Sequence, residues 1–408
     1  MKNIILLNDI FFGDSVKGKW TDYLVRKLNK NLVVRFNGGS NSAHNVVVGK
    51  IHHTFSQFGS GTLAGSATLF SKHTLIEPLA LENEATVLSE KVPFNPYSKH
   101  FIDSRAKLIT PFHVLANRLT SESKTTTGMG IWVTELNALD RPNDYLTISD
   151  LRSADLKNKL LRTKEYIQNK YGSNSAYDMD IHDLLKKYNS ISANLNILEP
   201  AEVNEMLNRS NLLFEGSQGI LLDENYGFHP YQSGSTTTKK NALEVLAEAG
   251  ITEKPINIGL ARVYANQHGK NPFPTYNTHL TSILPEPHNG FNRYQGEFKC
   301  GFADLELLKY AIRVNDGIDY IAFSHLDYLK KLDSWNVSIA YENCEMFVPK
   351  SLTEQELLGQ RLFNAIPQYE KIKSADVPSF LSKELNQEIF GVSYGAESNK
   401  TIVSNVYG

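Results

Sequence analysis

The chain has 408 residues and a formal net charge of −2, with 41% hydrophobic and 21% charged residues. This composition is typical of a folded globular protein, and the lack of a basic excess argues against a nucleic-acid-binding protein. The two cysteines, Cys300 and Cys344, are too few for a disulfide framework or a CxxC-type zinc site. Because neither a signal peptide nor a run of about 18 apolar residues is evident, we expect a cytoplasmic protein that binds small molecules and neither nucleic acid nor membrane.

Short apolar, β-branched runs alternate with longer helical patterns along most of the chain. The runs are residues 4–7, 32–36, 212–214, 256–263 and 320–323. This alternation is typical of parallel strands joined by crossover helices. We therefore predict an α/β fold in which residues 1–408 form a single domain, with a large, mostly parallel central sheet flanked by helices.

Residues 151–210 have a different pattern, because leucine and isoleucine recur there at helical spacing among many lysines and aspartates. We predict a helical insertion within the domain. Nearer the end of the chain, Ser351 followed by Glu354, or Thr353 followed by Glu356, provides a capping box. Either box predicts a helix that runs to about residue 363.

The stretch FFGDSVKGKWTD, residues 11–22, nearly matches a phosphate-binding loop. Gly13, Gly18 and Lys19 fit the G-x-x-x-x-G-K pattern, but Trp20 stands where Ser or Thr would bind magnesium. A helical pattern follows, so the loop would lie at a helix N-terminus, where free N–H groups and the helix dipole attract an anion. The pattern predicts a P-loop-like nucleotide-binding core, although an ordinary surface turn can carry the same side chains.

Other polar segments are further candidates for a site. His44 ends the small-residue stretch that follows the second apolar run, and Thr126 and Thr127 precede two glycines in a polar loop. Gln218 lies in a Gly-Ser-Gln-Gly turn, where the backbone can approach a flat ligand and the carboxamide offers both a donor and an acceptor. Asp327 follows an apolar strand, like the acidic residue that reads guanine in GTP-binding proteins. Each of these signals is weak alone, since lone histidines and polar loops are usually structural.

Taken together, these segments resemble the adenylosuccinate synthetase family, and the resemblance extends over nearly the whole chain. The family's opening loop, G-D-E-G-K-G-K, is matched here with Ser15 and Val16 substituted. Its next blocks, R-F-x-G-G-x-N-A-G-H, F-E-G-A-Q-G-x-L-L-D and G-P-F-P-T, are similar to residues 35–44, 214–223 and 271–275. Four ordered blocks at family-like spacing are a specific signal.

The resemblance implies a ligase that works in two steps. The γ-phosphoryl group of GTP goes to O6 of a 6-oxopurine nucleotide, most simply IMP, and the amine of aspartate then displaces phosphate at C6. Asp14 would take the N1 proton and also bind Mg²⁺ together with Ala43, so Trp20 would not need to. His44 would donate to the transferring phosphoryl group, Lys17 would neutralise developing charge, and Gln218 would orient the purine.

The resemblance also implies residues that hold the substrates. The nucleotide-binding residues would be Gly13, Ser15, Gly18, Lys19, Asn41, Thr126, Thr127, Ser233, His325, Asp327, Ser393 and Gly395. The amino-acid substrate would be held by Arg293 and Lys299. The family further implies a homodimer in which a partner subunit lends an arginine to the site.

Three departures from the family pattern bear on the substrates. The family's arginine-rich run is replaced by QGEFKCG, residues 295–301, and a lysine there cannot form the bidentate fork that suits a carboxylate. The guanine-reading T-K-L-D is replaced by SHLD, which leaves GTP favoured and ATP as the alternative. The family's T-T-G-R-G is replaced by TTTGMG, and Asn143 aligns with the lent arginine, with Arg141 close by.

Two other interpretations follow from these departures. One is the same chemistry on dGMP or GMP, on the way to diaminopurine, or on another nucleotide or amine in specialised metabolism. In the dGMP branch of the family a small residue makes room for a 2-amino group, so Asp14 argues against that substrate. The other is a nucleotide-binding sensor without catalysis, which would not need Asp14, His44 and Gln218 together.

Overall fold

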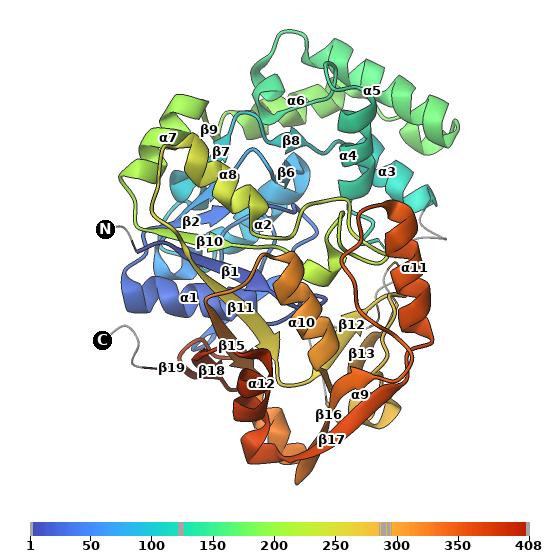
Figure 1. Ribbon diagram of the computed structural model, residues 1–408. Helices are drawn as coiled ribbons and strands as arrows, with labels where there is room; N and C mark the ends of the chain where they lie inside the picture. The colour runs from blue at the N-terminus through green and yellow to red at the C-terminus, as the bar shows by residue number, and fades with distance from the viewer. Residues whose placement is uncertain are drawn as a thin grey trace.

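A computed structural model describes residues 3–120, 126–284, 286, 291, 294 and 296–404, and the statements below concern these residues. A ten-stranded sheet forms the centre of the molecule, in the order β19-β18-β15-β11-β1-β10-β2-β5-β7-β9 (Figure 1). All neighbouring strands in it are parallel except β18 and β19. The strands are β1 (Ile5–Asp9), β2 (Leu32–Arg35), β5 (Ala67–Phe70), β7 (His100–Asp103), β9 (Asn196–Leu198), β10 (Leu212–Glu215), β11 (Ile256–Arg262), β15 (Tyr320–Ser324), β18 (Ile389–Ser393) and β19 (Thr401–Val403).

The predicted α/β class and mostly parallel sheet are confirmed, and each of the five apolar runs is a strand of this sheet. Smaller sheets are formed by β3 (His44–Val48), β4 (Ile51–Phe55), β6 (Leu75–Ile76), β8 (Lys107–Leu108), β12 (Ala265–His268), β13 (Phe298–Gly301), β14 (Ala303–Asp304), β16 (Ser334–Tyr341) and β17 (Pro367–Lys373). The α-helices are α1 (Lys17–Leu28), α2 (Pro78–Ser89), α3 (Pro111–Thr120), α4 (Ile131–Asp140), α5 (Leu156–Tyr171), α6 (Ile181–Ser192), α7 (Pro200–Asn208), α8 (Lys240–Glu248), α9 (Thr278–Ile283), α10 (Leu305–Val314), α11 (Leu352–Phe363) and α12 (Val377–Leu385).

The two faces of the sheet are covered by different helices because side chains alternate along each strand. Ile5 and Leu7 of β1 pack in one core with Trp20 and Leu24 of α1. Ile4 and Leu6 face the other way, into a core completed by α7 and α8. Trp20 is fully buried in the first of these cores, so the residue that breaks the phosphate-loop pattern anchors α1 to the sheet.

Residues 151–210, predicted to be a helical insertion, consist mostly of helices and also contain a strand of the main sheet. Helices α5, α6 and α7 account for most of the segment, and Figure 1 shows α5 and α6 together at the top of the molecule, far from β16 and β17. Strand β9 pairs with β7 at the edge of the sheet. A run of only three residues is too short to show a periodicity of two, so β9 could not be predicted from the pattern.

The helix near the C-terminus begins at the first of the two predicted capping boxes. Ser351 is the N-cap of α11, and its side chain accepts a hydrogen bond from the Glu354 amide at 3.2 Å. The alternative start at Thr353 is wrong. In the described part of the chain, no helix is long and apolar enough to cross a membrane.

Candidate active site

A cavity of about 380 Å³ opens above the carboxyl ends of the parallel strands. Its walls come from the loops after β1, β10, β11, β15 and β18, and from the segments around residues 41–47 and 126–132. The carboxyl ends of strands are where ligands bind in parallel α/β sheets. The fold thus brings to one place the separate segments that the sequence singled out.

The loop after β1 turns sharply before it enters α1. Gly13, Asp14 and Val16 all have positive φ values, of 104°, 62° and 52°. Gly18 lies in the first turn of α1, where a Cβ would come within 2.8 Å of the Asn45 carbonyl oxygen, so only glycine lets β3 pack this closely. The loop and the start of β3 therefore form one continuous wall of the cavity.

Lys17 and Lys19 leave this loop in different directions. The Lys17 ammonium donates to the Gln218 carbonyl at 2.7 Å and to the Asp9 carboxylate at 3.1 Å. The Lys19 ammonium donates to the carbonyls of Tyr394 and Gly395, at 2.8 and 3.0 Å, and also reaches the Lys400 carbonyl. Burial lowers the pKa of Lys19 to about 8. Lys19 thus holds the loop after β18 against the phosphate loop.

His44 is held by a buried carboxylate on the neighbouring strand. Its Nδ1 lies 2.8 Å from Oε1 of Glu215, the last residue of β10, and both side chains are buried. Burial lowers the pKa of His44 to about 4, although the nearby Glu215 carboxylate acts to raise it. The ring is therefore neutral at physiological pH. Burial alone would raise the pKa of Glu215, but His44, Arg35 and Ser60 together bring it to about 2. The ionised Glu215 therefore fixes the proton on Nδ1 and turns Nε2 away from itself.

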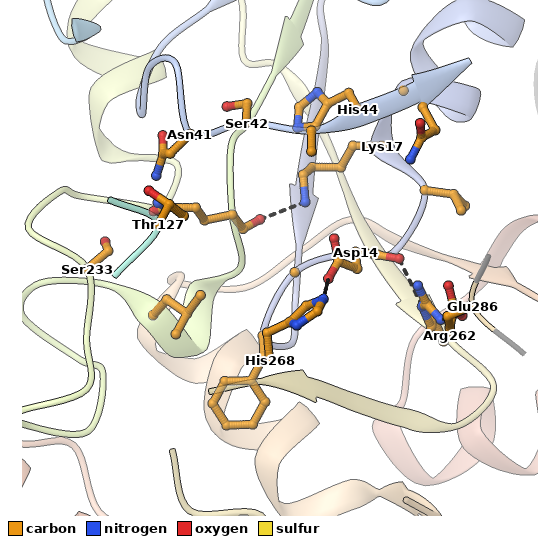
Figure 2. A pocket seen from close by; sticks show the side chains of 18 of the residues that line it. Asp14, Lys17, Asn41, Ser42, His44, Thr127, Ser233, Arg262, His268 and Glu286 are labelled. Carbon is orange, nitrogen blue, oxygen red and sulfur yellow. Dashed lines mark hydrogen bonds and ion pairs between the residues drawn. The ribbon is translucent and has the colours of Figure 1, made fainter. Parts of the chain in front are cut away.

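Asp14, in the loop after β1, lies between two basic side chains, Arg262 and His268 (Figure 2). The Arg262 guanidinium donates from Nε to the Asp14 carbonyl at 2.9 Å, and the His268 ring lies 3.9 Å from the Asp14 carboxylate. The Asp14 carboxylate is 31% exposed and faces the cavity. Arg262 is also paired with Glu286 and contacts the Tyr264 hydroxyl. The carboxylate is thus accessible to a ligand within a cluster of fixed charges.

The far side of the cavity is neutral. Figure 2 shows Asn41, Thr127 and Ser233 on the side away from Arg262 and Glu286, and all line the cavity. Among the described residues on this side, hydroxyl and amide groups alternate with apolar side chains such as Trp132. This surface offers hydrogen bonds without charge.

A third part of the cavity lies between the loops after β15 and β18. Asp327 accepts a hydrogen bond from the Gly395 amide at 2.9 Å through one carboxylate oxygen. His325 has a φ of 62°, and its ring packs edge-on against Tyr264 and Tyr328 at 5.7 and 5.3 Å between ring centroids. Burial lowers the pKa of His325, so its ring is neutral. A flat ligand would meet aromatic edges and one carboxylate here.

Most of the predicted site residues line this cavity. They are Gly13, Asp14, Lys17, Gly18, Lys19, Asn41, Ala43, His44, Thr126, Thr127, Gln218, Ser233, His325, Asp327 and Gly395. Ser15 and Ser393 are buried and do not line it, and the Ser15 hydroxyl has no hydrogen-bond partner among the described residues. The predicted roles of the lining residues remain predictions, since position alone does not test them.

The predicted amino-acid ligands are not part of the cavity wall. Lys299 lies in β13, where its ammonium donates to the Gly269 carbonyl at 3.2 Å, and it is not among the lining residues. Arg293 lies outside the described residues. Arg141, considered as a substitute for the lent arginine, is bonded within its own chain to Asp144 and to the Arg162 carbonyl.

The donor set at the phosphate loop fits Mg²⁺ bound together with a substrate phosphate. No group of three or more His, Cys, Asp or Glu side chains that could hold a metal occurs in the described segments. Mg²⁺ is commonly bound through one or two carboxylates plus substrate phosphates and water, and does not require a cage of protein ligands. The Asp14 carboxylate, with Ala43 as another residue of the same cavity lining, fits such an incomplete set.

Sequence reasoning missed several residues of the site. These are Asp9, Glu215, Arg262, His268 and Glu286, which bond to or lie beside predicted residues. Three of them, Asp9, Glu215 and Arg262, are the last residues of strands β1, β10 and β11. A polar residue at the carboxyl end of a buried parallel strand is the signal that could have found them.

Comparisons with known proteins agree with this geometry. The family model described as adenylosuccinate synthetase matches residues 8–393. An adenylosuccinate synthetase of Clostridium beijerinckii is 30% identical over 349 residues, 81% of this chain and 79% of that protein. One from Gloeothece citriformis is 29% identical over 439 residues, 99% of this chain and 94% of that protein.

Two solved structures share the fold. Fully ligated adenylosuccinate synthetase of Plasmodium falciparum matches with a TM-score of 0.84 at 20% identity, over 98% of this chain and all of that one. Succinoaminodeoxyadenylate synthetase of cyanophage S-2L, bound to dGMP and to dATP as an energy donor, matches with a TM-score of 0.64 at 14% identity, over 99% and 95%. The family model, which spans nearly the whole chain, confirms the resemblance seen in the sequence. The chain therefore belongs to the adenylosuccinate synthetase family, whose members are GTP-dependent ligases that join aspartate to a purine nucleotide.

Proposed function

We propose that the chain joins aspartate to C6 of IMP through a 6-phosphoryl intermediate formed with GTP. The observation that carries this proposal is the placement of the Asp14 carboxylate and the His44 ring, from two separate loops, in the wall of one cavity. A nucleotide-binding sensor would not need this pair of proton-transfer groups. The retained Asp14 also favours a 6-oxopurine without a 2-amino group.

In the first step, the Asp14 carboxylate takes the N1 proton of IMP and O6 attacks the γ-phosphorus of GTP. The bond from the γ-phosphorus to the bridging oxygen breaks, and GDP leaves. Lys17 is held beside the phosphate loop by the Gln218 carbonyl, so its charge is in place before the reaction begins. General-base help of this kind typically contributes about 10²- to 10⁴-fold to the rate.

In the second step, the amine of aspartate attacks C6 and the bond from C6 to O6 breaks. The oxygen that was O6 leaves as part of inorganic phosphate. The amine loses one of its protons, Asp14 releases the proton taken from N1 to solvent, and N1 stays unprotonated in the 6-amino product. His44 presents Nε2 to the phosphoryl group because Glu215 occupies Nδ1. An anionic phosphoryl group at Nε2 favours the protonated ring and thus opposes the effect of burial on its pKa. His44 would then donate a hydrogen bond to the leaving phosphate.

Mg²⁺ would be held by the Asp14 carboxylate and the Ala43 carbonyl and would neutralise part of the phosphate charge. The triphosphate base would lie between the loops that carry Asp327 and Gly395. One Asp327 oxygen is engaged by the Gly395 amide, which leaves the other to accept from guanine N1 and N2. Adenine has no donor at these positions, so this arrangement favours GTP over ATP.

Two side chains are candidates for the carboxylates of aspartate. Arg262 is the guanidinium that lines the cavity within the described segments, whereas Lys299 lies outside the lining. The Arg262 Nη2 group has no hydrogen-bond partner among the described residues and can donate to a substrate carboxylate. We expect Arg262→Lys to raise the KM for aspartate at least about tenfold, because a lysine cannot bond to the Asp14 carbonyl and Glu286 and at the same time hold a donor in the position of Nη2. Lys299→Met is the matched variant, and a larger effect there would assign the substrate to Lys299 instead.

The homodimer and the cytoplasmic location remain predictions. Among the described residues, the far side of the cavity has no Lys or Arg. A partner subunit would lend an arginine to the nucleotide phosphate on this side. Light scattering coupled to gel filtration gives the mass in solution. We expect the mass of a dimer. We also expect the KM for IMP to rise when the protein is diluted below the dissociation constant of the dimer.

Parallel incubations with Mg²⁺, GTP and aspartate test the substrate assignment. IMP, GMP and dGMP are supplied separately, and the purine product is identified by its mass. A succinyl adduct with IMP is expected. An adduct formed only with dGMP or GMP would replace IMP by a guanine nucleotide, and binding of nucleotides without any turnover would overturn the enzyme assignment. Replacing GTP by ATP in the productive mixture tests the phosphoryl donor.

A further inference from the structure

The carboxylate of Asp9 lies beneath the phosphate loop and takes no part in the mechanism described above. It is the last residue of β1, it is 2% exposed, and it does not line the cavity. Burying an ionised carboxylate is unfavourable unless hydrogen bonds and an opposite charge compensate for it. We therefore expect a carboxylate in this buried position to stabilise a particular conformation of the residues around it.

Among the described residues, the hydrogen bonds of the Asp9 carboxylate go to the phosphate loop and to Lys17, which follows it. One oxygen accepts from the amides of Phe11 and Gly13, at 3.0 and 3.2 Å. The other accepts from the Ser15 amide at 2.8 Å and from the Lys17 ammonium at 3.1 Å. The Asp9 carboxylate thus accepts hydrogen bonds from three backbone amides and one ammonium group within residues 11–17.

The loop needs these four hydrogen bonds, called the Asp9 clasp below, because its backbone is strained. Asp14 and Val16 are both in the left-handed region, with φ values of 62° and 52°. For a β-branched residue such as Val16 this conformation is a true outlier, which persists only where the surroundings enforce it. The Asp9 carboxylate bonds to the residues on both sides of Val16, through the Ser15 amide and the Lys17 ammonium.

We propose that Asp9 is a positioning residue, which holds the strained loop in its turn and thereby aims Lys17 and the Asp14 carboxylate at the ligand. The Lys17 ammonium has three N–H donors, of which one goes to Asp9 and one to Gln218. The third is left for a substrate phosphoryl group. This proposal concerns how the loop acts and rests on the proposed ligase function for its readout.

The test uses Asp9→Asn, which keeps the size of the side chain and replaces one acceptor oxygen by an NH₂ group. The full-length variant is assayed at a temperature where thermal unfolding shows it folded. We expect kcat for the IMP reaction to fall about 10- to 100-fold while the KM for aspartate stays within about twofold. If Asp9→Asn does not fold, Asp9→Glu replaces it, because it keeps the charge and displaces it by one methylene, with the same expected change.

A second variant separates loop positioning from general stability. Val16→Gly removes the strain that the clasp opposes, since glycine adopts the left-handed region without steric cost. The loss caused by Asp9→Asn should therefore be at least about fivefold smaller in a Val16→Gly background. Asp22→Asn is the matched control, because Asp22 is a buried carboxylate of α1 that bonds to Arg26 and not to the loop. It should lower the unfolding temperature and leave kcat within about twofold.

Three results would overturn the proposal. An unchanged kcat for folded Asp9→Asn would show that the loop does not need the clasp. An equal loss in the wild-type and Val16→Gly backgrounds would show that Asp9 does not act through the strained turn. A loss of kcat that simply follows the unfolded fraction of the protein would make Asp9 a structural residue only. Absence of turnover in the wild-type chain would instead count against the ligase function itself.

Discussion

At one end of the cavity the ammonium and imidazole groups of the mechanism are bonded to the protein before any ligand arrives, whereas the other end is lined by neutral hydroxyl and amide groups. Lys17 is held by Asp9 and Gln218, and His44 by Glu215. Asn41, Thr127 and Ser233 at the other end carry no charge. Fixed charges stabilise charge that develops during a reaction, while neutral hydrogen bonds hold ground state and transition state alike. Changes at the first end should therefore lower kcat, and changes at the second should raise KM.

The largest effect is expected from Asp14→Asn. The carboxamide keeps the shape of the side chain but cannot take the N1 proton, so kcat should fall about 10³-fold, within the range known for general bases. Steady-state kinetics with IMP as the varied substrate measures it. A loss of less than tenfold would contradict the role of Asp14 as the base.

A smaller effect on kcat is expected from Glu215→Gln. The amide can no longer hold the His44 ring with its proton on Nδ1, so the orientation of Nε2 toward the phosphoryl group is lost. We expect kcat to fall about 10- to 100-fold, less than for Asp14→Asn because His44 itself remains. Circular dichroism checks that the variant is folded, and an unchanged kcat would show that His44 does not act on the phosphoryl group.

The neutral end should respond in the opposite way. Thr127→Val keeps the shape of the side chain and removes one hydroxyl, whose hydrogen bond to a ligand is worth about 0.5–1.5 kcal/mol. The KM for IMP should rise about two- to tenfold, with kcat within twofold of the wild type. If Thr127→Val lowered kcat and left the KM for IMP unchanged, the neutral end of the cavity would not act through ground-state binding as expected.

The smallest effect is a dependence on pH through Lys19. As the pH rises above about 8, the ammonium loses its charge and one of the three N–H donors that bond to the carbonyls of residues 394–400, so the KM for GTP should rise about threefold by pH 9. In Lys19→Met this rise should be absent. Between about pH 8 and 10.5 the unfolded chain keeps the proton that the folded chain has lost, so this group adds to stability as the pH rises. A loss of activity there with unchanged KM for GTP would point to another group.

The fold could be predicted where the sequence pattern is local. Continuous apolar runs identified the central parallel strands, and His44, Gln218 and Asp327 meet at the cavity because each follows such a strand. Strand β9 was missed because its three residues show no period and its pairing with β7 is a tertiary contact. The start of α11 was found because a cap is set by the four residues around it.

The site was predicted less completely than the fold, for a physical reason. Family blocks identified residues that line the cavity, but the residues that hold these in place are selected by contacts across the sheet. Glu215 and His44 are 171 positions apart in the chain. Lys299 was chosen for its charge and its place in an alignment, and its ammonium is bonded to the Gly269 carbonyl outside the cavity lining. Arg262, at the end of a predicted strand, was passed over because it belonged to no family block.

The fate of the O6 oxygen is the most direct test of the proposed 6-phosphoryl intermediate. IMP carrying a heavy-oxygen label at O6 is converted with unlabelled GTP and aspartate, and the inorganic phosphate is analysed by mass spectrometry. A 6-phosphoryl intermediate predicts one label in each phosphate released with the succinyl adduct. Adduct formation with unlabelled phosphate would contradict the central claim, because O6 would then have left without ever bonding to the γ-phosphorus.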